Sequence, residues 1–65
     1  MLLDGGLINK LKGAKVTVRT LGVYYTGYIT SYEYRQELMS FRTVDERVVY
    51  IDADSITSIE VLTKE

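Results

Sequence analysis

Apolar and polar residues alternate along most of this chain with the period of two that is typical of β-strands. Strict alternation over Lys15–Thr20 predicts a half-buried first strand, with Val16 and Val18 on the same face. Further apolar runs predict four more strands, over Val23–Tyr32, Glu37–Val44, Val48–Ile51 and Ile56–Leu62. The Asp52–Ser55 segment predicts a turn between the last two strands, because Asp and Ser side chains bond nearby backbone groups.

The segment Leu21–Phe41 is predicted to form a hairpin around which the rest of the chain is arranged. Gly27 interrupts a run of aromatic and β-branched residues, so we expect the strand to bend sharply at a point where only a hydrogen fits. Alternation places Tyr25 and Ile29 on the core side together with this glycine. Gly22 is expected to supply a positive φ in the turn before it.

A short amphipathic pattern predicts a two-turn helix near residues 6–12. Leu7, Ile8 and Leu11 form one apolar stripe, and Gly13 stands where a C-terminal cap belongs. Because a helix this short is marginal by itself, we expect its stripe to cover the open end of a small barrel.

The predicted fold is therefore mainly β: a short N-terminal helix followed by a five-stranded, strongly bent antiparallel barrel, in one domain over residues 1–65. Eight residues are expected to lie largely inside: Val16, Val18, Tyr25, Ile29, Leu38, Ile51, Ile56 and Ile59. A 65-residue chain has a marginal core, so we expect support from oligomerisation. The chain has no proline, and nothing in its last two strands forbids pairing with another copy.

The composition removes several classes of function. The chain has no Cys and no His, which excludes disulfides and thiolate metal sites and removes the commonest base at neutral pH. Asp52 and Asp54 are better explained by an Asx-type turn than by a cation site. We expect a non-enzyme without cofactor or metal. No apolar run approaches the roughly 20 residues that cross a bilayer, so we expect a cytoplasmic protein with no membrane contact.

The net charge of −1 gives no argument for nucleic acid from the molecule as a whole, but the charges are unevenly placed. Residues 1–32 carry a net charge of +3, and residues 33–65 carry −4. Lys10, Lys12 and Lys15 are candidate phosphate contacts, although they also suit the C-terminal end of a helix.

Three stretches carry a family resemblance: Leu7–Val18, Gly22–Glu33 and Val49–Ile56. In the second stretch two glycines five residues apart are followed by an aliphatic residue and an aromatic–acidic pair: Gly22, Gly27, Ile29 and Tyr32–Glu33. In order and spacing these stretches resemble the Sm and Sm-like family, including Hfq-like proteins. The resemblance implies an open barrel whose fourth strand pairs with the fifth strand of a neighbour. Repeated by rotation, that contact closes a homo-oligomeric ring, expected to hold about five to eight subunits.

The resemblance also implies single-stranded RNA bound at the lumen or on a face of the ring. The predicted seam between subunits consists of Val48, Val49, Tyr50, Ile51, Ile56, Ile59 and Val61. The candidate RNA-binding residues are Arg35, Tyr34, Glu37, Asp52, Lys10, Lys12 and Lys15. The residues that would read a base depart from the family pattern. Where the family has an aromatic residue or His that stacks on a base and an Asn that reads it, this chain has Arg35 and Glu37. Where relatives carry a basic pair, this chain has Ile51-Asp52-Ala53.

The tyrosines and the acidic substitutions leave several functions open. Base stacking and an ordinary strand role are both open for Tyr24, Tyr28 and Tyr34. A place in the core or at a subunit interface is expected for Tyr25, Tyr32 and Tyr50. We expect Arg35 to pair with Glu37, and we expect weak or no oligo-uridine binding in the lumen, with residual RNA affinity on the lysine-bearing face. The alternatives are a ring that makes only protein contacts and an SH3-like barrel that binds a peptide on its tyrosines.

Overall fold

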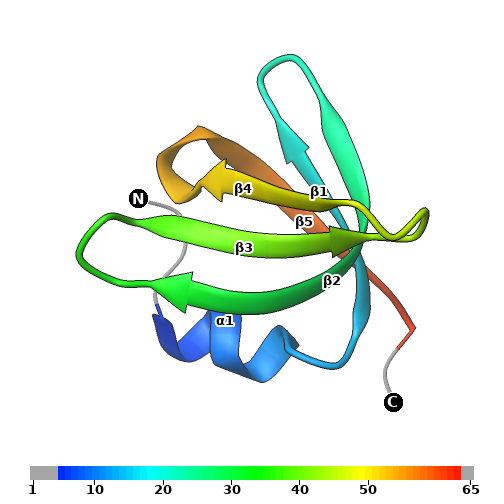
Figure 1. Cartoon of the computed structure of the whole chain (residues 1–65), viewed down its shortest axis with the longest axis horizontal. Coiled ribbons are helices and arrows are strands. Elements are labelled where there is room, and N and C mark those ends of the chain that lie inside the picture. Colours follow the sequence, from blue (N-terminus) through cyan, green and yellow to red (C-terminus); the bar gives the residue numbers. More distant parts are fainter. Residues whose placement is uncertain (1–4, 64–65) are drawn as a thin grey trace.

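The computed structural model describes residues 5–63, and it is mainly β (Figure 1). Its elements are α1 (Gly5–Leu11), β1 (Lys15–Thr20), β2 (Tyr24–Glu33), β3 (Leu38–Thr43), β4 (Val48–Asp52), the 3₁₀ helix η1 (Ala53–Ser55) and β5 (Ile56–Thr63). The predicted helix and all five predicted strands agree with these bounds to within one residue at either end. Among residues 5–63, no helix has the length and apolar character that crossing a bilayer requires.

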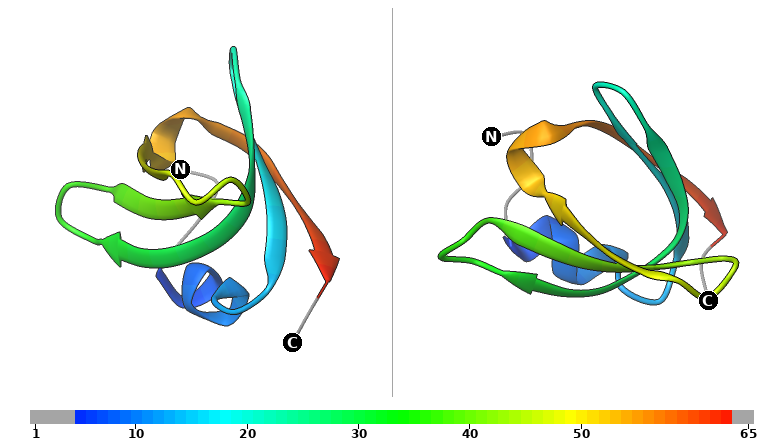
Figure 2. Two further views of the ribbon diagram at one scale, coloured as in Figure 1. Left: turned by 45° about the vertical axis from the view of Figure 1, so that its right-hand side comes forward. Right: turned by 45° about the horizontal axis from the view of Figure 1, so that its top comes forward.

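The five strands form one antiparallel sheet in the order β4-β3-β2-β1-β5. β4 and β5 are the two edges of this sheet and do not pair with each other, so the sheet is open and the predicted barrel is not confirmed. Two further views show the strong curvature of β2 and β3 (Figure 2). The turn between β1 and β2 projects from the rest of the sheet, at the top of Figure 1.

Gly27 lies in the middle of β2, where the strand has no room for a side chain. A Cβ atom at this position would collide with the carbonyl oxygen of Arg42 and would lie 2.8 Å from the Cα of Thr43. The close approach of β3 to β2 therefore depends on a glycine, which agrees with the expectation that only a hydrogen fits at this position. Just beyond it, the register between β2 and β3 shifts between Ile29 and Ser31, which marks a β-bulge.

The core lies between the inner face of the sheet and α1. Its buried apolar residues are Ile8, Ala14, Val16, Val18, Ile29, Met39, Phe41, Ile51, Ala53 and Ile56. Five of the eight residues expected inside are among them. Tyr25 and Ile59 are only partly buried and pack against this core. The bulge in β2 turns Tyr32 toward the same side, and it also packs there.

The facing predicted for β3 is wrong. Leu38 was expected inside, but it is only half-buried, whereas Met39 and Phe41 are completely buried. The pairing explains this result, because Met39 lies opposite Ile51 and Phe41 lies opposite Ile29. Residues opposite each other in an antiparallel pair share a face, so the core-facing positions of β2 and β4 decide which positions of β3 are buried.

Helix α1 packs against the sheet through part of its predicted stripe. Ile8 is fully buried and Leu11 is partly buried against the core, while Leu7 is 42% exposed. The helix ends as predicted, with Gly13 at φ +88° and the N–H of Ala14 donating to the carbonyl oxygen of Leu11 at 3.1 Å.

Candidate functional site

The turn between β2 and β3 meets the segment between β4 and β5. The N–H of Ala53 donates to the carbonyl oxygen of Glu37 at 2.8 Å, and Glu37 adopts a φ of +53°. Asp52 caps η1, because its carboxylate accepts from the N–H of Asp54 at 3.0 Å. The Asx-type turn expected here is therefore present, and it brings three acidic residues together: Glu37, Asp52 and Asp54.

The side chains of these residues, here called the acidic cluster, affect one another. The negative charge of Asp54 raises the pKa of Glu37, and partial burial, a hydrogen bond with the Asp54 side chain and the charge of Asp52 add to the effect. Burial raises the pKa of Tyr32, and the nearby charges of Glu37 and Asp54 raise it further. The region is therefore a concentrated negative field that disfavours a phosphate.

Arg35 lies in the same turn, but it does not neutralise the cluster through an ion pair. Its backbone N–H donates to the Glu33 carboxylate at 2.9 Å, and no ion pair joins Arg35 to Glu37 within residues 5–63. The expected pairing is thus not observed. Tyr34, the neighbouring candidate for base stacking, is 75% exposed.

The candidate phosphate-binding lysines lie on α1 and on the residues that follow it, up to the start of β1. Lys10 is in the last turn of α1, and Lys12 follows the helix. Both are exposed, while Lys15, at the start of β1, is half-buried. The three lysines are therefore carried by the helix, by the connection that follows it and by the first residue of β1, and not by the two turns that hold the acidic cluster.

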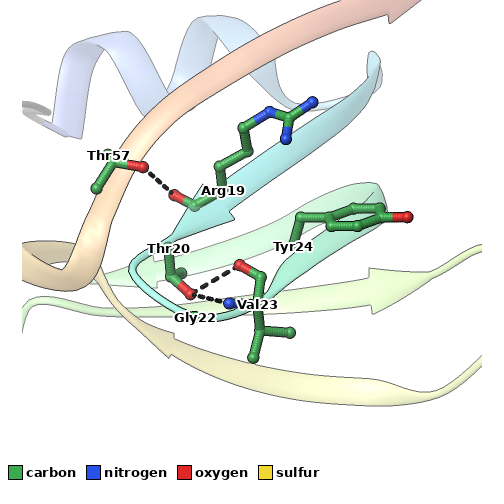
Figure 3. A pocket seen from close by; sticks show the side chains of 6 residues that line it. All are labelled: Arg19, Thr20, Gly22, Val23, Tyr24 and Thr57. Carbon is green, nitrogen blue, oxygen red and sulfur yellow. Dashed lines mark hydrogen bonds between the residues drawn. The ribbon is translucent and has the colours of Figure 1, made fainter.

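A pocket of about 250 Å³ lies beside the β1–β2 turn (Figure 3). It is lined by Arg19, Thr20, Gly22, Val23, Tyr24 and Thr57. The guanidinium carbon of Arg19 lies 5.7 Å from the centroid of the Tyr24 ring, a cation–π distance. The Thr57 hydroxyl donates to the carbonyl oxygen of Arg19 at 3.2 Å, which attaches β5 to this site.

The β1–β2 turn is held by hydrogen bonds and not by a special glycine conformation. The Thr20 hydroxyl donates to the carbonyl oxygen of Val23 at 2.8 Å and accepts from the Val23 N–H at 3.3 Å. Gly22 does not have a positive φ, so the prediction for that residue is wrong. Leu21, at the tip of the turn, is 90% exposed.

A second arginine–tyrosine pair lies on the same face of the sheet. The guanidinium carbon of Arg42 on β3 lies 5.6 Å from the ring centroid of Tyr28 on β2. The sequence predictions named both tyrosines as stacking candidates but missed Arg19 and Arg42 as their partners. The hairpin register would have found them, because Arg19 lies opposite Tyr24 and Arg42 lies opposite Tyr28.

The predicted seam residues divide into exposed and buried ones. On the β4 edge Val48 is 62% exposed and Tyr50 is 67% exposed, so Tyr50 is not part of the core. On the β5 edge Val61 is 48% exposed. The side chains of Val49 and Ile59 are partly buried against the core, and those of Ile51 and Ile56 lie within it. Exposed apolar side chains thus follow both edges of the sheet.

Within the described part of the chain, no group of three acidic side chains is arranged as a metal site. Comparisons of this chain with protein-family models, with curated proteins and with solved structures found no match.

Proposed function

We propose that this protein is a subunit of an Sm-like ring that binds single-stranded RNA outside its acidic cluster. The observation that carries the proposal is the pair of free edges, β4 and β5, at the two ends of one curved antiparallel sheet. Each edge is continuous over five residues or more and contains no proline. An unprotected edge of this kind is a template for pairing with another chain.

Pairing β4 of one copy with β5 of the next joins two different surfaces of the same protein. A contact of this heterologous type either closes into a ring or continues as a fibre. The curvature of the sheet favours a closed ring over a fibre, because the free edge of each added copy points in a different direction from the edge of the copy before it. Exposed Val48, Tyr50 and Val61 would be covered in the process. For a 65-residue chain, this burial supplements a core that is marginal alone.

The acidic cluster argues against RNA binding at the turns where the resemblance implies it. Phosphate contacts gain affinity by releasing counterions, and carboxylates multiplied around a ring oppose that gain. The basic side chains of Lys10 and Lys12 are exposed on a different element, and Arg19 and Arg42 lie on the sheet. RNA is therefore expected on these surfaces.

The decisive experiment measures mass and RNA binding on the same preparation. Size-exclusion chromatography with light scattering is expected to give a single closed oligomer of the full chain. Gel shifts with oligo-uridine at two salt concentrations are expected to show weak binding.

Exchange of Glu37→Asn together with Asp52→Arg is expected to raise oligo-uridine affinity, because it removes the repulsion between these carboxylates and the RNA phosphates. Lys10→Ala with Lys12→Ala is expected to lower the affinity of the parent.

A ring that makes only protein contacts is the second candidate, and the acidic cluster favours it. It predicts a closed oligomer that shifts neither oligo-uridine nor oligo-adenosine at low salt. A monomer in solution would contradict both ring proposals and would favour an SH3-like peptide-binding module. Tight oligo-uridine binding that is lost in Arg35→Ala and kept in the lysine variant would place RNA at the turns after all.

A further inference from the structure

The pocket beside the β1–β2 turn, here called the turn pocket, combines a cation with apolar surface in a small space. Its volume is about 250 Å³, and its lining residues come from β1, from the turn, from the start of β2 and from β5 (Figure 3). This volume lies below the ~300–1,000 Å³ that is typical of sites for drug-sized ligands. The turn pocket therefore fits about one residue of a larger ligand.

Arg19 supplies a positive charge to the turn pocket that no carboxylate of the described residues neutralises. Its guanidinium carbon lies 5.7 Å from the centroid of the Tyr24 ring, which positions the head group without an ion pair. The ion pair found among residues 5–63 joins Arg47 to Asp45. None of the lining residues is acidic, and the residue opposite Arg19 on β5 is Ser58. The N–H donors of the guanidinium are therefore available to an anionic group of a ligand.

The turn that forms the pocket carries apolar side chains in solvent. Val23 lines the pocket and is 53% exposed, and Leu21, at the tip of the turn, is also exposed. Turns more often hold Gly, Asn, Asp or Ser at such positions. The hydrogen bonds between Thr20 and Val23 already hold this turn, and neither apolar side chain belongs to the core. Leu21 and Val23 are therefore apolar surface that the fold leaves open to a ligand.

One ligand residue must match both features, because Arg19 and Val23 line the same small pocket. An internal residue of a peptide carries either a carboxylate or an apolar side chain. The last residue of a chain carries both, since its main-chain carboxylate and its side chain leave the same Cα atom. A planar carboxylate also matches two N–H donors of a single guanidinium, whereas a nucleic-acid backbone follows a groove of several basic groups. Arg19 is the one basic residue among the six that line the pocket.

We propose that the turn pocket binds the carboxyl terminus of a partner protein whose last residue is apolar. Arg19 pairs with the terminal carboxylate, and Val23 and the ring of Tyr24 contact the last side chain. Leu21 extends the apolar surface toward the preceding residues of the partner. Capture of a chain terminus is a recurrent mode of peptide recognition. The inference goes beyond the proposed function and does not depend on it, because one subunit supplies every lining residue.

The test follows the NMR chemical shifts of the full chain during titration with short glycine–serine peptides that end in leucine, valine or phenylalanine. Each peptide is used with a free carboxyl terminus and as the carboxyl-terminal amide. Saturable shifts of Leu21, Gly22 and Val23 are expected with at least one free acid. The matching amide is expected to bind about ten-fold more weakly or less, because it lacks the charge that pairs with Arg19.

Two variants and one matched control locate the site. Arg19→Gln is expected to weaken binding of the free acid about ten-fold or more. Arg42→Gln is the matched control, because Arg42 also lies over a tyrosine ring, at 5.6 Å, but does not line the pocket. It is expected to bind the peptide like the parent. Val23→Ser is expected to weaken binding while circular dichroism shows an unchanged fold, because this side chain is outside the core.

The outcomes separate this inference from the proposed function. Saturation by none of the three free acids, equal binding of acid and amide, or equal weakening by Arg19→Gln and Arg42→Gln would overturn it. Adenosine monophosphate that shifts the same turn residues at lower concentration than the peptides would also overturn it, because the pocket would then be a phosphate site. Failure of the parent to bind oligo-uridine would contradict the proposed function and leave this inference standing.

Discussion

The backbone N–H of Ala53 donates to the carbonyl oxygen of Glu37 at 2.8 Å, and this bond joins two turns that are far apart in the sequence. Because of it, the Glu37 carboxylate lies near the carboxylates of Asp52 and Asp54. Like charges that the fold holds together destabilise it. This unfavourable repulsion lies at the place where the resemblance to Sm-like proteins implies an RNA site.

The first prediction concerns the pH dependence of stability. The pKa of Glu37 is raised in the folded protein, chiefly by Asp54, so the folded state binds this proton more tightly than the unfolded chain does. Stability from this group is gained as the pH falls through the raised pKa and is lost as the pH rises above it. Glu37→Gln is therefore expected to raise the melting temperature at pH 7. The gain is expected to shrink as the pH falls through the raised pKa and to be lost below the carboxyl's ordinary value of 4.5.

Thermal melts of the parent and of Glu37→Gln across this pH range measure the effect. Glu60→Gln removes the same charge from an exposed position on β5 and is the control. A gain at neutral pH that is equal in both variants would mean that net charge, and not the acidic cluster, is responsible. Asp45 acts in the opposite direction, because the hydrogen bond from Thr43 lowers its pKa and its contribution is lost on acidification.

The second prediction concerns the close approach of β2 and β3. Gly27→Ala places a methyl group against the backbone of Arg42 and Thr43, which cannot move without opening the sheet. We expect a loss of about 1–3 kcal/mol or more in the free energy of unfolding, measured by urea denaturation. Gly22→Ala is the matched control, because a Cβ there meets nothing within 4 Å and the φ is not positive. Equal stabilities would show that β3 does not approach so closely.

The third prediction tests the facing of β3. Phe41 is fully buried, lies opposite Ile29 and has its ring 6.5 Å from that of Tyr25. Phe41→Ala is expected to cost about 3–5 kcal/mol, which is close to the whole stability of a domain this small. Leu38→Ala is expected to cost clearly less, because its side chain is only half-buried. Urea midpoints in the reverse order would mean that the opposite face of β3 packs on the core.

The fourth prediction tests the seam. Val48 is exposed on the β4 edge, and a lysine on an edge strand blocks pairing with another chain. If the proposed ring forms through β4, Val48→Lys is expected to yield monomers, as measured by light scattering. Leu21→Lys introduces the same side chain at the exposed tip of the β1–β2 turn and is expected to keep the mass of the parent.

Val49→Pro is a stronger version of the same test, because proline removes a backbone donor. The Val49 side chain packs against the core, however. If the proline variant fails to assemble, this result must therefore be separated from unfolding. If Val48→Lys runs at the mass of the parent, β4 does not form the subunit contact.

The local pattern of the sequence determined the elements of this protein. Alternation placed all five strands, the apolar stripe placed the helix, and Asp52 with its neighbours marked the turn that η1 occupies. Gly27 identified the position on β2 where only a hydrogen fits. These features depend on residues that are adjacent in the chain, so propensity, turn chemistry and steric limits are sufficient to find them.

Only the tertiary structure decided which face of β3 is buried and which side chains meet. Leu38, Met39 and Phe41 put apolar residues on both faces of the strand, so alternation alone has two solutions, and the register with its neighbours selects one. Long-range pairing likewise placed Arg19 and Arg42 over tyrosines and gathered the acidic residues at the meeting of two turns. The sequence determined the strands because their signals are local. The candidate sites depended on the fold, because each joins residues from different strands.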